Sequence, residues 1–299
     1  MALTSFRDLM ANADEGGYAV GYFESWNLES LLAVADAAEA THSPVILGFS
    51  GLSLPDPSRV VKDRLEPYAA MGLSVCQGLS VPACLLFNES PYIKWLWQAI
   101  ELGFNMVMFS DDELDPAEQE EVIRGVVGRA QRADIAVEAE MVSVPGVHGE
   151  LTAIPTSLQL SDPAAASAFV RRTGVDALAV NIGQAHLHGR AKLNLDLDRL
   201  AALRDAVPVP LVLHGASSVA RRDLAEAVRL GIRKVNVGSA IKRAYFEAVR
   251  RASIQAGDAY NTYEVVGSGL AADVEAAGRL AMRAVVEDLM RLFGSAGKA

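Results

Sequence analysis

The chain has 299 residues, a formal net charge of −10 at pH 7, a sequence pI of about 5.0 and two cysteines. Nucleic acid is excluded as a partner, because an acidic chain lacks the clustered lysines and arginines that neutralise phosphates. No apolar run approaches the roughly twenty residues of a membrane helix and the first residues resemble no secretory signal, so we expect a soluble, cytoplasmic protein without membrane contact. Cys76 and Cys84 are predicted to be buried, reduced thiols, since two cysteines are too few for a disulfide framework.

Eight short apolar runs, most of them followed by a segment with helical periodicity, are typical of alternating β/α units and a parallel sheet. Eight such units in a chain of this length favour a closed (β/α)8 barrel over a doubly wound sheet. We therefore predict an α/β fold, a TIM barrel that forms a single domain over residues 1–299. The predicted strands are residues 18–23, 44–49, 81–87, 105–109, 136–140, 177–181, 210–213 and 234–237.

The segments between these runs carry helix start and stop signals. Asp162 followed by Pro163 provides an N-cap and a first-turn proline, and glycines such as Gly174 and Gly231 end helices. A further apolar pattern over residues 271–293 predicts added C-terminal helical structure that covers the barrel or contacts another subunit. The predicted helices between strands are residues 28–40, 91–102, 116–133, 162–173, 197–206 and 220–230.

The carboxyl ends of the predicted strands are the places to search for chemistry, because barrel active sites lie at that end. His186, His188 and His214 follow the sixth and seventh strands. Glu89, at the end of the third strand, is the carboxylate best placed to join two histidines around a divalent metal such as zinc. A hydrogen-bonded histidine at a barrel end and a solvated loop histidine would explain the same spacing, so both interpretations stay open.

Glycine and serine also gather after the seventh and eighth strands. Small residues in turns before helix N-termini expose backbone N–H groups to an anion, although they are also ordinary turn formers. Because they recur at two neighbouring strand ends, we predict a site for a phosphate or a carboxylate. Its residues are Gly215, Ser217, Asn236, Gly238 and Ser239.

Four motifs stand out along the chain: TGVDALAV at 173–180, the Gly-x-x-His at 183–186, PLVLHGASS at 210–218 and KVNVGSA at 234–240. Through these motifs and the segments 18–29 and 43–51, the chain resembles the class II, metal-dependent fructose- and tagatose-bisphosphate aldolases. The resemblance covers most of the chain. It implies a (β/α)8 barrel and reversible aldol cleavage, with a divalent metal, usually zinc, that polarises the ketone.

The sequence departs from that family at the end of the third strand. Two of the three metal-binding histidines that the resemblance implies match His186 and His214, but Glu89 stands in place of the third. A carboxylate there would favour a harder metal such as Mn or Mg. Asn88 replaces the aspartate that exchanges a proton with the substrate hydroxyl. A neutral amide can orient a hydroxyl but cannot serve as a general base.

Further departures lie at neighbouring strand ends. Ser110 replaces an aspartate after the fourth strand, and Glu24 replaces an asparagine after the first. With Glu138 and Glu140 these changes give the barrel an acidic mouth. His148 takes the place of an acidic residue in the long irregular connection after the fifth strand. A histidine there can move a proton, or it is simply a solvated loop residue.

The residues and the resemblance predict a metal-dependent lyase that cleaves or forms a C–C bond next to a carbonyl, on a sugar-derived substrate other than the standard fructose bisphosphate. Glu89, His186 and His214 would hold the metal, Asn88 would orient the reacting hydroxyl, and His148 would move the proton. Two alternatives stay open: a barrel that binds or senses a ligand without catalysis, and an isomerase or decarboxylase that uses the same metal. The resemblance and the C-terminal helices also predict a homodimer or homotetramer.

Overall fold

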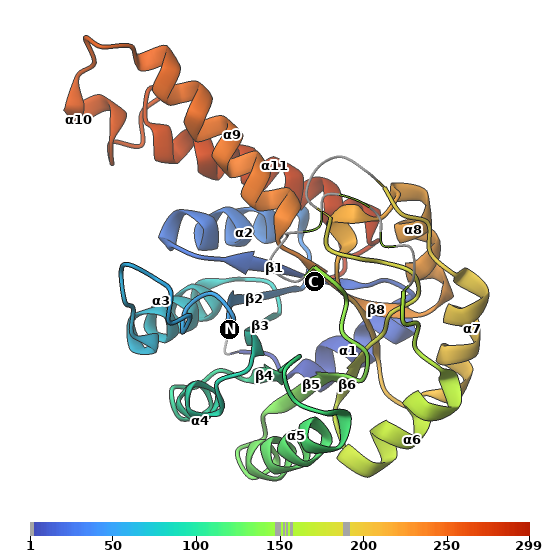
Figure 1. The fold of residues 1–299 in the computed structure, drawn as a ribbon. Helices are drawn as coiled ribbons and strands as arrows, with labels where there is room; N and C mark the ends of the chain where they lie inside the picture. Colours follow the sequence, from blue (N-terminus) through green and yellow to red (C-terminus); the bar gives the residue numbers. More distant parts are fainter. Residues whose placement is uncertain (1–2, 147–150, 152, 154, 156–157, 188–191) are drawn as a thin grey trace.

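The computed structural model describes residues 3–146, 151, 153, 155, 158–187 and 192–299, and its strands close into a parallel barrel in the order β1 to β8 (Figure 1). The predicted (β/α)8 architecture is therefore confirmed. Each strand pairs with its neighbours in the chain, and β1 closes the barrel against β8. The strands are β1 (Val20–Ser25), β2 (Val45–Ser50), β3 (Ala83–Ser90), β4 (Met106–Phe109), β5 (Ala136–Glu140), β6 (Ala177–Ala179), β7 (Leu211–Leu213) and β8 (Ile232–Val237).

The helices surround this barrel, and several begin and end at the residues that the sequence indicates. The Asp162 side chain accepts a hydrogen bond from the backbone of Ala165, and Gly174 ends that helix with a φ of 72°. The helices are α1 (Phe6–Gly16), α2 (Leu28–Thr41), α3 (Leu65–Gly78), α4 (Ile93–Glu101), α5 (Pro116–Gln131), α6 (Pro163–Thr173), α7 (Leu197–Ala206), the short 3-10 helix η1 (Ala216–Ser218), α8 (Arg221–Leu230), α9 (Ser239–Ala256), α10 (Thr262–Val265) and α11 (Val274–Leu292). None of the described helices is long and apolar enough to cross a membrane.

Most buried apolar side chains belong to two cores, one inside the barrel and one between the strands and the outer helices, and a small third cluster contains Ala185, Leu187 and Leu193. Strand periodicity produces this division, because successive residues face opposite sides of a sheet. In β8, Val235 and Val237 belong to the outer core, while Lys234 and Asn236 are buried on the other face. The interior is thus apolar toward the amino ends of the strands and polar toward their carboxyl ends. Cys76 and Cys84 are both buried, as predicted.

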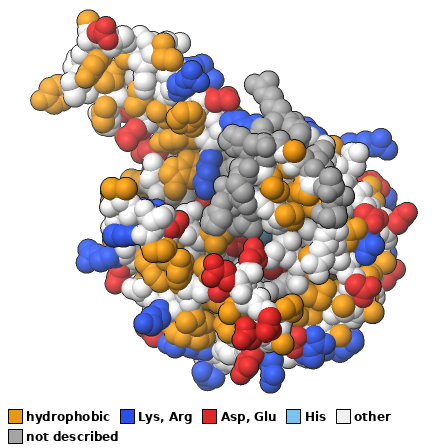
Figure 2. Space-filling view, viewed as in Figure 1, with side chains coloured by type: hydrophobic (Ala, Val, Ile, Leu, Met, Phe, Trp, Pro, Cys, Tyr) orange, Lys and Arg blue, Asp and Glu red, His pale blue; other side chains and the backbone are white. Residues whose placement is uncertain are grey.

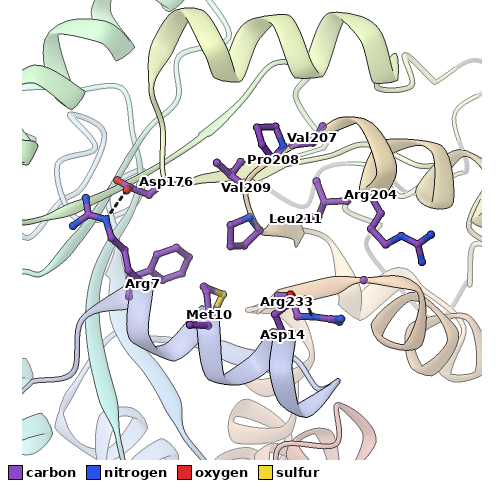
Figure 3. A pocket seen from close by; sticks show the side chains of 14 residues that line it. Arg7, Met10, Asp14, Asp176, Arg204, Val207, Pro208, Val209, Leu211 and Arg233 are labelled. Carbon is purple, nitrogen blue, oxygen red and sulfur yellow. Dashed lines mark hydrogen bonds and ion pairs between the residues drawn. The ribbon is translucent and has the colours of Figure 1, made fainter.

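Helix α1 closes the amino end of the barrel, where its apolar face joins the inner core. Arg7 of α1 donates a hydrogen bond to Asp176 over 2.9 Å, as Figure 3 shows. A cavity of about 400 Å³ lies beside this contact. Charged side chains that line this cavity form ion pairs with each other, such as Arg233 with Asp14 at 2.8 Å. The cavity contains none of the residues that the sequence predicts for a site, so we place function at the opposite end of the barrel.

The C-terminal helices form an arm that projects from the barrel (Figure 1). Helices α9 and α11 pack against each other, α10 lies near the tip, and α11 also packs on α2. The two long helices cross closely at Gly278, where an added Cβ would lie 2.8 Å from the ring of Tyr245. The added C-terminal helices that the sequence predicts are therefore present, and they reach beyond the barrel.

Candidate active site

A polar cavity of about 240 Å³ lies at the carboxyl ends of β1, β2, β3, β7 and β8. The structure brings together here every residue that the sequence predicts for the site except His148. His148 and His188 lie outside the described residues. The predicted residues that line the cavity are Asn88, Glu89, His186, His214, Gly215, Ser217, Asn236, Gly238 and Ser239.

The end of β3 directs two consecutive side chains into this cavity. Successive strand residues normally face opposite sides, but Glu89 has a left-handed backbone with a φ of 52°. The pairing of β3 with β4 also shifts between Phe87 and Ser90. This bulge allows both Asn88 and Glu89 to line the cavity. Backbone strain at a residue other than glycine persists where the surroundings enforce it, and it is common at functional sites.

Four charged side chains form a continuous chain of contacts at the base of the cavity, which we call the buried ion chain: Glu89, His214, Glu138 and Lys234. His214 Nδ1 lies 2.8 Å from Glu89 Oε1, and its Nε2 lies 2.7 Å from Glu138 Oε1. Lys234 Nζ lies 2.7 Å from Glu138 Oε2. The side chains of His214, Glu138 and Lys234 are at most 2% exposed. Negative and positive groups alternate, which offsets the cost of burying each charge.

The pKa values follow from these contacts. Burial alone would lower the pKa of His214, but the charge of Glu89 and hydrogen bonds to both carboxylates raise it to about 10. Burial would raise the pKa of Glu89, and the charge and hydrogen bond of His214 instead lower it to about 2. Both shifts favour the charged forms of His214 and Glu89 in the ligand-free molecule. Burial lowers the pKa of Lys234, an effect that Glu138 opposes.

Two asparagines complete the wall above the buried ion chain. Asn88 Nδ2 donates to Glu89 Oε2 over 2.7 Å. Lys234 Nζ donates to Asn236 Oδ1 over 2.5 Å, which points the Asn236 amide nitrogen toward His214, 2.9 Å from Nε2. The amide of Asn88 thus touches the carboxylate that the sequence assigns to the metal. It can orient an oxygen in the cavity but cannot take up its proton.

The end of the cavity formed by β7 and β8 contains the predicted anion-binding residues. Gly215 adopts a left-handed φ of 65° before η1, and Ser217 Oγ accepts a hydrogen bond from the Ala240 backbone over 3.0 Å. Glu24 lies against the start of α9, because a Cβ added at its N-cap, Gly238, would be 2.6 Å from Glu24 Oε2. Lys242 Nζ donates to Glu24 Oε1 over 2.5 Å. This end therefore already contains one carboxylate and one ammonium group.

The sequence did not single out Tyr22, which lines the cavity, or Lys234, which belongs to the buried ion chain. The position of Lys234 could have been predicted from strand periodicity, because KVNV places it two residues before Asn236 on the same face of the strand. Tyr22 likewise lies two residues before Glu24 on the inner face of β1. Of the acidic residues that the sequence assigned to the barrel mouth, Glu24 and Glu89 line the cavity and are half-buried, and Glu138 and Glu140 are fully buried. Figure 2 shows further acidic side chains near the middle of this face.

A closed (β/α)8 barrel with a polar cavity and buried acid and base groups at its strand ends defines an enzyme of the TIM-barrel class. The family model of class II fructose-bisphosphate aldolases matches residues 4–298. The chain therefore belongs to the class II fructose-bisphosphate aldolase family, and it is a lyase that acts on a sugar-derived substrate.

Individual relatives agree with this assignment over the whole chain. A sulfofructosephosphate aldolase from Alkalicoccus urumqiensis is 29% identical over 300 residues, which covers 100% of this chain and 99% of the relative. The crystal structure of the YdjI aldolase from Escherichia coli K12 is 30% identical, with a TM-score of 0.80 and 99% of both chains covered. The fructose-bisphosphate aldolase of Campylobacter jejuni has a TM-score of 0.80 at 18% identity, covers 100% of this chain and 97% of its own, and shares the fold.

Proposed function

We propose that this barrel is a metal-dependent aldolase whose substrate differs from fructose bisphosphate. The observation that carries the proposal is the pairing of Glu89 with His214 beside Asn88 in the strand-end cavity. An asparagine cannot remove a hydroxyl proton, so the proton that aldol cleavage releases needs another acceptor. The similarity to a sulfofructosephosphate aldolase supports a sugar-derived substrate with a changed substituent.

The donor chemistry of the cavity fits a divalent metal. Glu89 supplies carboxylate oxygens, and His186 and His214 supply ring nitrogens, which are ligand types that zinc and manganese accept. Among the residues that the structure describes, no three such side chains are arranged as a ready metal site. Instead, His214 Nδ1 and Glu89 Oε1 contact each other directly over 2.8 Å. When bound, the metal would polarise the substrate carbonyl.

The other proposed roles belong to the protein's own side chains. Asn88 orients the reacting hydroxyl through its amide, and His148 from the connection after β5 accepts the proton. Glu138 contacts Nε2 of His214 and is itself paired with Lys234, and these contacts fix the orientation of the His214 ring. The backbone around η1 and the start of α9 binds a phosphate or another anionic group, through Gly215, Ser217, Asn236, Gly238 and Ser239.

Metal content tests the proposed ligands. Protein purified without chelator is expected to contain close to one Zn, Mn or Mg ion per chain by elemental analysis. Glu89→Gln and His186→Gln each remove a ligand atom while keeping a side chain of similar size, so the content should fall at least about tenfold. Glu24→Gln is the matched control, because Glu24 is a cavity carboxylate outside the ligand set. Metal retained in Glu89→Gln would refute this assignment.

Turnover tests the reaction. The metal-loaded enzyme is incubated separately with sulfofructose phosphate and fructose 1,6-bisphosphate, and the released aldehyde is trapped and measured. We expect the sulfonated ketose to be cleaved at least about tenfold faster in kcat/KM, which corresponds to about 1.4 kcal/mol of transition-state stabilisation. Substrate consumption without aldehyde would indicate an isomerase or decarboxylase. Binding without consumption would indicate a non-catalytic barrel.

A homo-oligomer is part of the proposal. The arm of α9, α10 and α11 exposes large apolar side chains, among them Phe246 and Tyr263, which are 63% and 89% exposed. Apolar surface gathered on a projecting element is typical of a protein contact. We assign this surface to a second copy of the chain in a homodimer or homotetramer.

A further inference from the structure

Tyr22 of β1 has a hydroxyl group that none of the contacts above uses. The residue is 2% exposed and lines the strand-end cavity. Its oxygen has no hydrogen-bond partner among the residues that the structure describes. Buried hydroxyl groups are nearly always paired, because an unpaired one loses its bonds to water without replacement. The exception therefore calls for a physical explanation.

The ring of Tyr22 is fixed in position. β1 pairs with strands on both sides, which places Tyr22 opposite Ile46 of β2 and Asn236 of β8. The ring packs in the apolar core inside the barrel, and Lys234 Nζ lies 5.2 Å from the ring centroid. A ring held between neighbouring strands and this core cannot turn to seek a partner elsewhere.

None of the neighbouring carboxylates accepts a hydrogen bond from the Tyr22 hydroxyl. Burial raises the pKa of Tyr22 well above its ordinary value, and the negative charges of Glu24, Glu89 and Glu138 raise it further. The phenol is thus protonated at neutral pH and acts as a donor. Each carboxylate instead binds other groups: Glu89 binds His214 and Asn88, Glu138 binds His214 and Lys234, and Glu24 binds Lys242.

We propose that the Tyr22 hydroxyl donates a hydrogen bond to an uncharged oxygen of the substrate, a hydroxyl or a carbonyl, at the β1 side of the cavity. The inference rests on the proposed function and adds a substrate-binding residue to it. An uncharged oxygen fits better than an anion, because Glu24 and Glu89 already place negative charge at this wall. An anionic group of the substrate would instead bind near Ser217, where Lys242 lines the same cavity and supplies a positive charge.

Tyr22→Phe tests this directly, because it removes the hydroxyl and leaves the ring. Dihydroxyacetone, an uncharged ketone with two hydroxyls, is the probe, and its dissociation constant is measured by NMR titration of the full-length protein. We expect Tyr22→Phe to bind about tenfold more weakly than the wild type. Tyr68→Phe is the control, since Tyr68 binds Asp63 outside the cavity, and it should bind the probe like the wild type. Equal binding by Tyr22→Phe would overturn the proposal.

Thermal melting without ligand provides an independent readout. Tyr22→Phe should melt at or above the wild-type temperature, because the lost hydroxyl has no bond to lose and no longer needs desolvation. Tyr68→Phe should melt lower, because it loses its 3.1 Å bond to Asp63. A clear drop in Tyr22→Phe would show that the hydroxyl is bonded in the free protein, which contradicts the inference.

The two possible failures are distinguishable. A wild type that neither binds dihydroxyacetone nor cleaves a ketose would overturn the proposed function together with the role of Tyr22 in it. A wild type that cleaves a ketose, combined with a Tyr22→Phe variant of unchanged KM and kcat on that ketose, would leave the function standing and remove Tyr22 from the site.

Discussion

Glu140, at the end of β5, is a carboxyl group whose charge state controls part of the stability. It is 2% exposed and accepts a hydrogen bond from Ser110 Oγ over 2.5 Å. Burial raises its pKa to about 7, and the charges of Glu89 and Asp112 act in the same direction, while the charge of His214 opposes them. The hydrogen bond from Ser110 also lowers the pKa, but burial outweighs it, so Glu140 stays protonated in mildly acidic solution.

This pKa predicts a pH-dependent effect of Glu140→Gln. Between pH 4.5 and about 7 the folded protein keeps a proton that the unfolded chain has lost, so the wild type loses stability as the pH rises. A shift from 4.5 to about 7 corresponds to about 3 kcal/mol. Glutamine resembles the protonated carboxyl at every pH. In urea unfolding, Glu140→Gln should match the wild type at pH 4.5 and exceed it by up to about 3 kcal/mol at pH 8.

Glu121→Gln on the exposed face of α5 is the control, and its free energy of unfolding should differ from the wild type by the same small amount at both pH values. If Glu140→Gln instead destabilised the protein equally at both pH values, Glu140 would be ionised in the folded state, and the assignment of a raised pKa would be wrong.

At the residue scale, the sequence could predict which side chains meet but not how they bind each other. Strand ends in a barrel converge, so Glu89, His186 and His214 were expected in one place. That His214 would have a carboxylate at each ring nitrogen was not predictable, because the convergence of strand ends does not say which side chain contacts which nitrogen. The bulge at Glu89 was equally hidden, since a glutamate carries no signal for a left-handed backbone.

At the scale of the elements, all eight strands and seven of the helices, α11 among them, were predictable from their apolar period and their caps, with ends shifted by a few residues. Helices α1, α3 and α9 and the short helices α10 and η1 were not identified. α3 has Arg64 as its N-cap, which makes no capping hydrogen bond through its side chain, and Leu79 as its C-cap. α9 follows Gly238 directly from β8, so no polar turn separates strand from helix.

Helix α1 is held to the barrel by a contact that the sequence does not show. Asp176, just before β6, accepts a hydrogen bond from Arg7 over 2.9 Å (Figure 3). It accepts another from the backbone N–H of Val137, also over 2.9 Å. Its side chain is 13% exposed. Asp176→Ala leaves that N–H without its acceptor, and we expect the free energy of unfolding in urea to fall by about 1–3 kcal/mol.

Asp134→Asn is a matched control for this element, because Asp134 binds the same Arg7 at 2.8 Å but is 86% exposed, and asparagine tolerates its left-handed backbone with a φ of 54°. Exposed ion pairs contribute little, so its loss should cost less than about 1 kcal/mol. Equal losses in the two variants would show that the Arg7 ion pair, and not the bond to Val137, fastens the amino end of the barrel.

On the scale of the whole molecule, α9 connects the candidate site to the arm. It begins at Ser239, which lines the cavity together with Lys242, and it continues into the projecting part of the structure (Figure 1). Apolar side chains are visible along the arm in Figure 2. A partner that covers the arm would therefore hold the same helix whose first turn forms the anion end of the site. Association and substrate binding are expected to support each other for this reason.

The arm predicts the oligomeric state. Light scattering after size exclusion should give a mass of two or four times 31.8 kDa for the wild type. Introducing charge with Phe246→Asp and Tyr263→Asp buries unpaired carboxylates in the proposed interface, which should dissociate it into chains of 31.8 kDa. Val60→Asp and Val61→Asp add the same charge at exposed apolar residues before α3, and that variant should keep the wild-type mass. A monomeric wild type, or an arm variant of unchanged mass, would show that the exposed arm does not serve self-association.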